Sequence, residues 1–482
     1  MFASLSRFFF QNQTLKQTAA KNTVWLFLGQ IVGRLLRAIL VIYAARVLGP
    51  EQWGAFSYVV GLVAFFLIFS DIGTSAIVTR ESAKDMASGE KYFATAFLLK
   101  LLPLTASILL LLFGNRYLTN IESARMLMPL VIFLLLFDSI RNFGFTMSRA
   151  TQKMELEAGN EVLTNLLVVL FGFYFLQMEP TPQHLLFGYI FGTLGGFLLT
   201  LFILRESFFR ILRNFDRALV MPLLTNALPF AFASFLGAIM INTDMLMLGW
   251  LRTPAELGYY SAAQKPVQLF YVFASLFASS LFPIFSQLTQ DKERFRSILE
   301  KALAAALLVA IPLALGSLVL GSHLIILLFG NEYAPATSSF QILMLTVLII
   351  SPSVIVSNAL LSQNQQKRFV MFSLIGALGN VLFNFLLIPF WGIAGCAFST
   401  LITQILANTF IWKKLAAYQP FSITRHLRHL LIAGSGMTFA IYPLEKIHTP
   451  LFVTLTIAVI IYFGLLKIQK DTILHEIIKL KL

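Results

Sequence analysis

The hydrophobic positions of this chain occur in long runs that charged residues seldom interrupt. Examples are Val24–Val47, Phe93–Phe113 and Leu303–Leu328. A helix that crosses the hydrocarbon core of a bilayer needs roughly 20 predominantly apolar residues, and these runs reach that length. They lack the strict alternation of apolar and polar residues that is typical of a membrane β-barrel strand. The pattern therefore predicts an all-α integral membrane protein.

The runs divide into about fourteen expected transmembrane helices. Short polar or Gly/Pro-containing stretches separate them. The expected segments are 24–47, 54–78, 93–113, 125–150, 160–178, 184–205, 226–250, 258–285, 299–328, 336–361, 369–390, 393–412, 428–444 and 450–467.

Composition agrees with lipid as the surrounding solvent. Of the 482 residues, 58% are hydrophobic and only 12% are charged, whereas a soluble domain carries about 25% charged residues. The single cysteine, Cys396, excludes an intramolecular disulfide. A packed core residue is the plain interpretation of that cysteine.

The net charge of +14 is distributed unevenly over the loops. Most Lys and Arg residues fall on alternate loops. The opposite loops carry only Arg46, Arg116, Arg125, Arg252 and Lys446. Because cytoplasmic loops of membrane proteins are enriched in Lys and Arg, this bias predicts a cytoplasmic (inner) membrane location with both termini in the cytoplasm. No nucleic-acid partner is needed to explain the charge.

Several motifs occur twice, in the same order. Phe113-Gly114-Asn115-Arg116-Tyr117 resembles Phe329-Gly330-Asn331-Glu332-Tyr333, and Pro50 to Ser57 resembles Pro254 to Ser261. Gln152-Lys153 likewise corresponds to Gln366-Lys367. A repeat of six helices preserves orientation, so we expect two parallel six-helix lobes related by a pseudo-twofold axis along the membrane normal, with the binding site between the repeats.

This organisation predicts five regions. We expect a cytoplasmic amphipathic lead-in, an amino-terminal lobe, a basic cytoplasmic linker, a carboxy-terminal lobe, and two further helices with a cytoplasmic tail. Their boundaries are 1–22, 23–205, 206–225, 226–412 and 413–482.

Two arginines occupy the middle of the first expected span. Arg34 and Arg37 share one helical face with Gln30, whereas the opposite face is apolar. Ionisable residues inside a membrane are costly and mark candidate functional sites. The arginines are expected either to line a wet cavity that receives anions, or to pair with a carboxylate on a neighbouring helix, such as Asp71 or Asp138.

Other polar residues lie within the spans. Asp138, Arg141 and Asn142 share a face of the fourth span and form either a self-sealing ion pair or part of a ligand site. Lys100 is expected to line the lumen or, more simply, to snorkel to the cytoplasmic boundary. Arginine binds phosphate bidentately and keeps its charge, so a lumen with Arg34, Arg37, Lys100 and Arg141 suits a pyrophosphate-linked ligand.

The second half carries an acid and a base at similar expected depth. We expect Asp244 and Lys265 to pair, either as a structural bridge or as a site of protonation or sodium binding. The candidates for ion coupling are therefore Asp71, Asp138, Asp244 and Lys265.

The beginning of the chain resembles a known family. The residues Gly29-Gln30, Gly33-Arg34, Ala45-Arg46-Val47-Leu48-Gly49-Pro50-Glu51, Gly54-Ala55-Phe56-Ser57-Tyr58, Asp71-Ile72-Gly73 and Arg80-Glu81 resemble the amino-terminal signature of Wzx-type polysaccharide and O-antigen flippases. These belong to the multidrug/oligosaccharidyl-lipid/polysaccharide (MOP) superfamily.

The resemblance implies a fold and a substrate. It implies two lobes arranged in a V, alternating access driven by H⁺ or Na⁺ without a bound cofactor, and an undecaprenyl-diphosphate-linked oligosaccharide moved from the cytoplasmic to the periplasmic leaflet. It further implies that Arg34 and Arg37, and in addition Arg46 and Arg80, contact the diphosphate. Partners would be the polyprenyl-diphosphate-linked oligosaccharide, membrane lipid and a polysaccharide polymerase.

Two other classes of function fit the sequence less well. An enzyme is disfavoured, because the chain has no glycine-rich phosphate loop, zinc-binding His/Glu spacing or nucleophile elbow. A drug or cation antiporter of the same superfamily, similar to the MATE transporters, is the nearer alternative. Its site should be lined by acids and aromatic residues rather than by Arg34 and Arg37.

Overall fold

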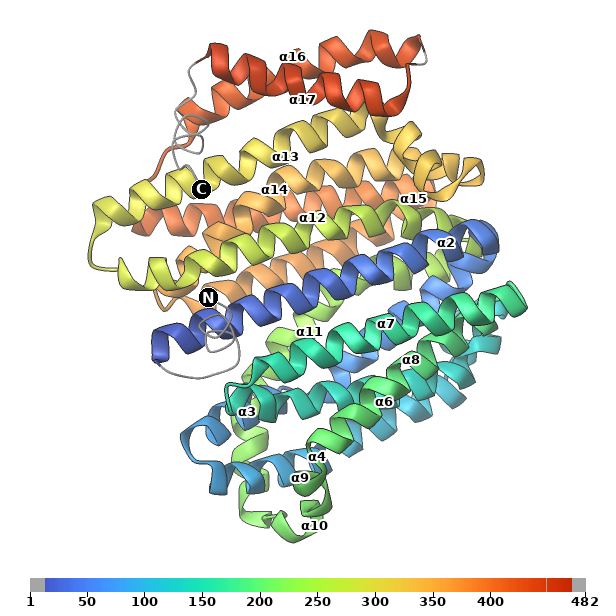
Figure 1. Ribbon diagram of the computed structural model, residues 1–482, viewed down its shortest axis with the longest axis vertical. Coiled ribbons are helices and arrows are strands. Elements are labelled where there is room, and N and C mark those ends of the chain that lie inside the picture. Colours follow the sequence, from blue (N-terminus) through green and yellow to red (C-terminus); the bar gives the residue numbers. More distant parts are fainter. Residues whose placement is uncertain (1–13, 448, 470–482) are drawn as a thin grey trace, which may run out of the picture. The chain divides into compact units, whose positions relative to one another are not determined.

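Helices form every regular element of the part of the chain that the structure describes. The computed structural model describes residues 14–447 and 449–469, and no strand occurs in these ranges (Figure 1). In chain order the elements are α2 (Leu15–Asp71), α3 (Thr74–Lys84), α4 (Met86–Phe113), α5 (Asn115–Leu118), α6 (Glu122–Ala150), α7 (Met154–Met178), α8 (Pro182–Ile203), α9 (Arg205–Phe209), α10 (Ile211–Asn214), the 3₁₀ helix η1 (Arg217–Leu219), α11 (Val220–Leu251), α12 (Pro254–Gln287), α13 (Lys292–Phe329), the 3₁₀ helix η2 (Asn331–Ala336), α14 (Thr337–Ser362), α15 (Gln366–Tyr418), α16 (Thr424–Lys446) and α17 (Leu451–Ile468).

Eleven helices in the described ranges are long and apolar enough to cross a membrane, which confirms the all-α membrane class. Two of them, α2 and α15, are far longer than one crossing requires. Each contains a break at a glycine with positive φ: Gly49 (φ 72°) and Gly392 (φ 56°). The breaks lie between segments that the sequence predicts as separate helices. Glycine permits this backbone conformation because it has no Cβ.

The second expected helix ends earlier than predicted. A continuous helix over 54–78 is wrong, because α2 ends at Asp71 and α3 begins at Thr74 after Ile72 (φ 42°) and Gly73 (φ 77°). The break brings Gly73 against the backbone of α11, where an added Cβ would lie 2.7 Å from the Ala227 carbonyl oxygen. No side chain larger than hydrogen fits at this approach.

The predicted count of fourteen spans stays a prediction. The last expected pair corresponds to α16 and α17, but α16 is not among the eleven candidate spans. The expected linker 206–225 contains α9, α10, η1 and the start of α11. Residues 1–13 of the expected lead-in and 470–482 of the expected tail lie outside the described residues.

The chain divides into two compact units, Met1–Gly258 and Tyr259–Leu482. In the first unit α2 lies against α7, α6 and α11, and α7 packs along α8. An apolar core under α3 joins α4, α6 and α11 through Val78, Phe93, Phe143 and Ala227. The lobe boundaries expected from the repeat stay predictions.

The second unit centres on α13. This helix packs against α14 on one side and α16 on another, and α16 in turn packs against α17, the red pair of Figure 1. Met437 of α16 and Tyr462 of α17 join the apolar cluster on α13. The Tyr462 hydroxyl donates a hydrogen bond to the Leu308 carbonyl oxygen at 3.0 Å. A buried tyrosine needs such a partner for its polar end.

The repeated motifs form similar local structures. Both Phe-Gly-Asn copies end a long helix and start a short helical turn, which is α5 after Gly114 and η2 after Gly330. The turns after α6 and after α14 each contain a non-glycine residue with positive φ, Gln152 (φ 55°) and Asn364 (φ 58°). The match is partial, because Gly114 (φ −85°) and Gly330 (φ 97°) differ in conformation, and Gln366 begins α15 whereas Gln152 lies in a turn. The six-helix repeat stays a prediction.

Another repeated pair lies in direct contact. A Cβ added to Gly54 would lie 1.8 Å from the Pro254 carbonyl oxygen, and one added to Gly258 would lie 1.9 Å from that of Pro50. The nearby end of α11 is also held, because Trp250 Nε1 donates to the Leu118 carbonyl oxygen at 2.6 Å. The two glycines let backbone meet backbone at this end of the first unit.

We predict that Gly54→Ala destabilises the protein by on the order of 1–3 kcal/mol, because overpacking against backbone cannot be relieved by a side-chain rotation. The measurement is the melting temperature of the purified protein in detergent. Gly237→Ala on α11 is the control, because an added Cβ there meets nothing within 4 Å. Equal melting temperatures of Gly54→Ala and wild type would contradict the close approach.

Candidate functional site

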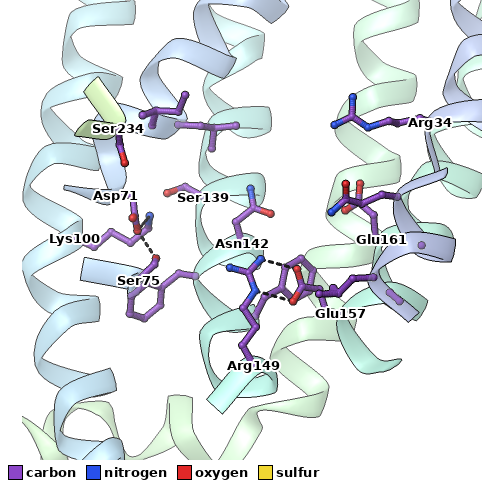
Figure 2. Close-up of a pocket in the computed structure, with 18 residues that line it drawn as sticks. Arg34, Asp71, Ser75, Lys100, Ser139, Asn142, Arg149, Glu157, Glu161 and Ser234 are labelled. Atoms are coloured by element: carbon purple, nitrogen blue, oxygen red, sulfur yellow. Dashed lines mark hydrogen bonds and ion pairs between the residues drawn. The ribbon is translucent and has the colours of Figure 1, made fainter. Parts of the chain in front are cut away.

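A cavity of about 500 Å³ lies within the first unit. Its walls come from α2, α6 and α7, with one residue each from α3, α4 and α11. Figure 2 shows Arg34 and Glu161 on one side and Asp71, Ser75 and Lys100 on the other, with Asn142 between them. The polar lining residues are Gln30, Arg34, Asp71, Ser75, Lys100, Ser139, Asn142, Arg149, Glu157, Glu161 and Ser234.

Arg34 faces this cavity without an ion-pair partner among the described residues, and its side chain is exposed. Arg37, one turn later on α2, is half-buried and places its guanidinium 5.3 Å from the centre of the Tyr189 ring. The Arg37 Nε is buried without a hydrogen-bond partner. The alternative in which Asp71 or Asp138 neutralises these arginines is wrong, because both carboxylates pair with other cations.

Arg141 on α6 is buried and held by two carboxylates. Its Nη2 lies 2.9 Å from Asp138 Oδ1, and its Nη1 lies 2.8 Å from Glu161 Oε2. The hydroxyl of Thr164 accepts a third contact at 3.3 Å. The intrahelical pair expected from the sequence is confirmed, and α7 adds a second acid. A buried guanidinium needs several such acceptors because removing it from water is costly.

Lys100 on α4 is buried, with only 3% of its surface exposed. Its Nζ lies 3.6 Å from Asp71 Oδ1 and 5.7 Å from the centre of the Phe143 ring. The Ser75 hydroxyl donates a hydrogen bond to the same Asp71 oxygen. Snorkelling of Lys100 to the boundary is therefore wrong. The carboxylate of Asp71 on α2 supplies the counter-charge for the buried ammonium.

Two further ion pairs fix the start of α7. Arg149 at the end of α6 binds Glu157 bidentately, at 2.6 and 2.9 Å. The fully buried Lys21 of α2 lies 2.9 Å from Glu155. Arg149 and Glu157 line the cavity, whereas Lys21 and Glu155 do not. These pairs anchor α7 to its neighbours and set the position of Glu161 one turn further along.

The pairing leaves an excess of positive charge on α2. Lys100, Arg141 and Arg149 each have a carboxylate within ion-pair distance, but Arg34 and Arg37 have none among the described residues. Of these two, Arg34 lines the cavity and Arg37 does not. An unpaired guanidinium group in a polar cavity favours an anion that offers several oxygens, such as a phosphate. In the ranges that the structure describes, no group of three or more His, Cys, Asp or Glu residues could hold a metal ion.

Some predicted site residues lie elsewhere. Arg46 and Arg80 are exposed and do not line the cavity. Arg80 pairs with Glu81 at 2.7 Å. The hydrogen bond from Lys84, more than the Arg80 contact, lowers the pKa of the Glu81 carboxyl below its ordinary value. Asp244 is buried on α11, and its expected pairing with Lys265 stays a prediction.

Three charged lining residues escaped the sequence analysis: Arg149, Glu157 and Glu161. The expected fifth helix began at residue 160, so the two acids fell near or before its start. The sequence does contain a pattern that indicates the two acids, because residues 157, 161 and 165 are polar and, at a spacing of four, share one face of α7.

We predict that Arg141→Gln lowers the stability of the protein by about 3 kcal/mol, because it leaves two carboxylates without their buried cation. Arg34→Gln, which removes no ion pair, should change stability by less than about 1 kcal/mol. Thermal unfolding of the purified variants in detergent measures both effects. An equal loss in the two variants would mean that protein contacts hold Arg34, contrary to its cavity-facing position.

Comparison with curated proteins finds relatives of low identity but broad coverage. The probable low-salt glycan biosynthesis flippase Agl15 of Haloferax volcanii is 23% identical, over 80% of this chain and 80% of that protein. The putative O-antigen transporter of Shigella dysenteriae is 21% identical, over 82% of this chain and 99% of that protein. These relatives are named as flippases and transporters rather than as enzymes.

Solved structures show the same fold. The lipid II flippase MurJ in an inward closed conformation aligns with a TM-score of 0.75 at 18% identity, covering 93% of this chain and 99% of that one. An inward-facing multidrug resistance MATE transporter of the MOP superfamily aligns with a TM-score of 0.67 at 14% identity, covering 80% of this chain and 95% of that one.

Two families match the sequence itself. Residues 229–386 match the MatE family. Residues 19–289, which include every residue that lines the cavity, match the family described as polysaccharide biosynthesis protein. Because this second match covers more than half of the 482 residues, the chain belongs to the polysaccharide biosynthesis protein family.

Proposed function

We propose that this protein moves an undecaprenyl-diphosphate-linked oligosaccharide from the cytoplasmic to the periplasmic leaflet, for surface polysaccharide synthesis. The observation that carries the proposal is the position of Arg34 and its lack of an ion pair. Its guanidinium faces a cavity of about 500 Å³ and has no carboxylate partner among the described residues. A fixed cation in that position is stable in a membrane only with water or an anionic guest beside it.

A diphosphate is the anion that fits this position best. Two guanidinium groups one helical turn apart can each offer a two-pronged donor to phosphate oxygens. The cavity volume lies within the range of ~300–1,000 Å³ that is typical of small-molecule sites. It suits the polar head of the substrate, while the polyprenyl chain stays in lipid.

The names of relatives support the same substrate class. Proteins similar over most of the chain are named as a glycan biosynthesis flippase, an O-antigen transporter and a succinoglycan transport protein. The solved structure with the same fold is named as a lipid II flippase. A lipid-linked glycan is common to this proposal and to those names.

A drug or cation antiporter is the second candidate, and the MatE match over residues 229–386 favours it. A cationic drug needs an unpaired acid. In the cavity, however, Asp71 pairs with Lys100, Glu157 with Arg149 and Glu161 with Arg141. With Arg37 and the Asp138–Arg141 pair included, five cations meet four carboxylates, so the site favours an anionic substrate.

Finer features belong to the proposal as well. We infer alternating access between two six-helix lobes, both termini in the cytoplasm, and Gln30, Lys100 and Asn142 as lumen-lining polar groups. Three further roles remain predictions from the sequence. One is contact of the diphosphate with Arg141, Arg46 and Arg80. The others are coupling of H⁺ or Na⁺ through Asp71, Asp138, Asp244 or Lys265, and association with a polysaccharide polymerase.

We predict that the double variant Arg34→Ala/Arg37→Ala loses at least about tenfold of its export activity, since a charge-assisted hydrogen bond contributes ~1.5–3 kcal/mol. The measurement is surface polysaccharide in cells that lack the native protein and express each variant at equal level. The control is Arg294→Ala/Arg296→Ala on α13, which removes two exposed arginines that do not line the cavity. Full export by the cavity variant would reject the diphosphate role.

Reconstitution separates the two candidate functions. Proteoliposomes that contain lipid-linked glycan should show protein-dependent flipping, whereas proteoliposomes loaded with a cationic dye should show no protein-dependent efflux. Dye efflux that requires the protein but not Arg34, without glycan flipping, would favour the antiporter.

A further inference from the structure

Glu161 lines the cavity and forms an ion pair with Arg141, which does not itself line the cavity. Its Oε2 accepts a hydrogen bond from Arg141 Nη1 at 2.8 Å, and its Oε1 accepts one from Asn165 Nδ2 at 2.9 Å. Its side chain is one-third exposed and lines the cavity (Figure 2). Both Arg34 and Arg37 lie close enough to interact electrostatically with this carboxylate, although neither forms an ion pair with it. Glu161 is thus bound to Arg141 and also acts electrostatically on Arg34 and Arg37.

Glu161 is the second carboxylate bound to Arg141, which already has Asp138 as a counter-ion. Asp138 Oδ1 accepts from Arg141 Nε and Nη2 at 3.2 and 2.9 Å, which is a two-pronged pair on its own. Arg141 therefore keeps a counter-ion if Glu161 moves away. Glu155 and Glu157, on the same helix, are each the carboxylate nearest to one cation, Lys21 and Arg149. Among these three acids of α7, Glu161 is the dispensable one for local neutrality.

The geometry of Glu161 resembles that of a bound phosphate oxygen pair. Two oxygens accept from a guanidinium and from an amide, with further guanidinium charge nearby. A phosphate that enters the cavity would seek the same donors, and it would meet a like charge in Glu161. Binding of a diphosphate therefore requires the carboxylate to give up its contacts or to tolerate repulsion.

A carrier needs such an opposing charge, because arginine does not lose its positive charge by deprotonation at working pH. Arg34 in the cavity, with Arg37 one helical turn away, would hold a diphosphate tightly, and tight uniform binding slows release without speeding transfer. A carboxylate within reach offers the arginines a replacement anion as the substrate departs. This lowers affinity and shortens the time that the substrate stays bound.

We propose that Glu161 is a built-in competitor of the substrate, which offsets the charge of Arg34 and Arg37 when the site is empty and limits their affinity for a diphosphate. Glu161 is thus a specificity- and affinity-setting residue, distinct from the arginines that contact the ligand. The inference rests on the proposed function, since it requires that the cavity bind a phosphate-bearing lipid.

The test measures binding of undecaprenyl diphosphate to the full-length protein in nanodiscs, with undecaprenol as the uncharged comparison. Glu161→Gln should bind undecaprenyl diphosphate about tenfold more tightly than wild type, a change of ~1.4 kcal/mol, and should flip lipid-linked glycan more slowly. Affinity for undecaprenol should not change. Arg34→Gln should bind undecaprenyl diphosphate more weakly.

The matched control is Glu155→Gln. It removes an ion pair of similar length, 2.9 Å, from the same helix, but Glu155 does not line the cavity. Its affinity for undecaprenyl diphosphate should equal that of wild type. Glu161→Ala provides a second removal of the carboxylate, and the melting temperature of each variant verifies folding.

The outcomes separate the two proposals. Unchanged or weaker binding by both Glu161 variants, with binding by wild type and loss in Arg34→Gln, overturns the competitor role and leaves the proposed function intact. Absence of diphosphate-dependent binding by wild type overturns the proposed function and this inference together. Tighter binding by Glu155→Gln as well would show a general charge effect and would also overturn the specific role of Glu161.

Discussion

A positive charge inside a membrane-spanning helix must find a counter-charge, water or an anionic ligand, and the first unit of this protein is arranged around that constraint. Burying an ion without a partner costs several kcal/mol even after local relaxation. Lys100, Arg141 and Arg149 meet the requirement with carboxylates from a neighbouring helix. Arg34 meets it by facing a cavity. The helix contacts of α2, α4, α6 and α7 follow from these pairings.

Small residues on α2 make the pairing geometry feasible. A Cβ added to Gly29 would lie 2.9 Å from Ala158 of α7, and one added to Gly33 would lie 2.7 Å from Asn165 Nδ2. Helices in membranes approach closely where such small residues meet. Each glycine directly precedes a polar cavity residue, Gln30 or Arg34. The motif therefore combines a packing surface with a charged one, and it brings Glu161 near the arginines.

Local sequence patterns predicted the features that lie within a single helix. The shared face of Gln30, Arg34 and Arg37 follows from a period of 3.6 residues, and the Asp138–Arg141 pair follows from a spacing of three. The apolar runs predicted the helical segments themselves, and glycines with positive φ account for the interruptions within α2 and α15.

Interactions between helices could not be predicted in the same way. Whether Lys100 reaches the membrane surface or Asp71 depends on the path of α2, which turns at Ile72 and Gly73. The role of Glu161 depends on how α7 is rotated against α2 and α6. Periodicity marks Glu161 as polar on its helix, but it carries no information about which cation on another helix it meets. Such pairings need coordinates.

The charge pattern also bears on how a carrier can both bind and release one cargo. If the arginines stood alone, affinity would rise with every added contact, and release would slow by the same factor. If carboxylates matched every cation, a phosphate would have no reason to enter. The site lies between these limits. Arg34 in the cavity and Arg37 one turn away have no ion pair among the described residues, and Glu161 is a carboxylate that Arg141 does not require, because Asp138 also binds it. An intermediate affinity follows from that imbalance, and it is the condition under which a fixed positive site can operate through repeated cycles of transport.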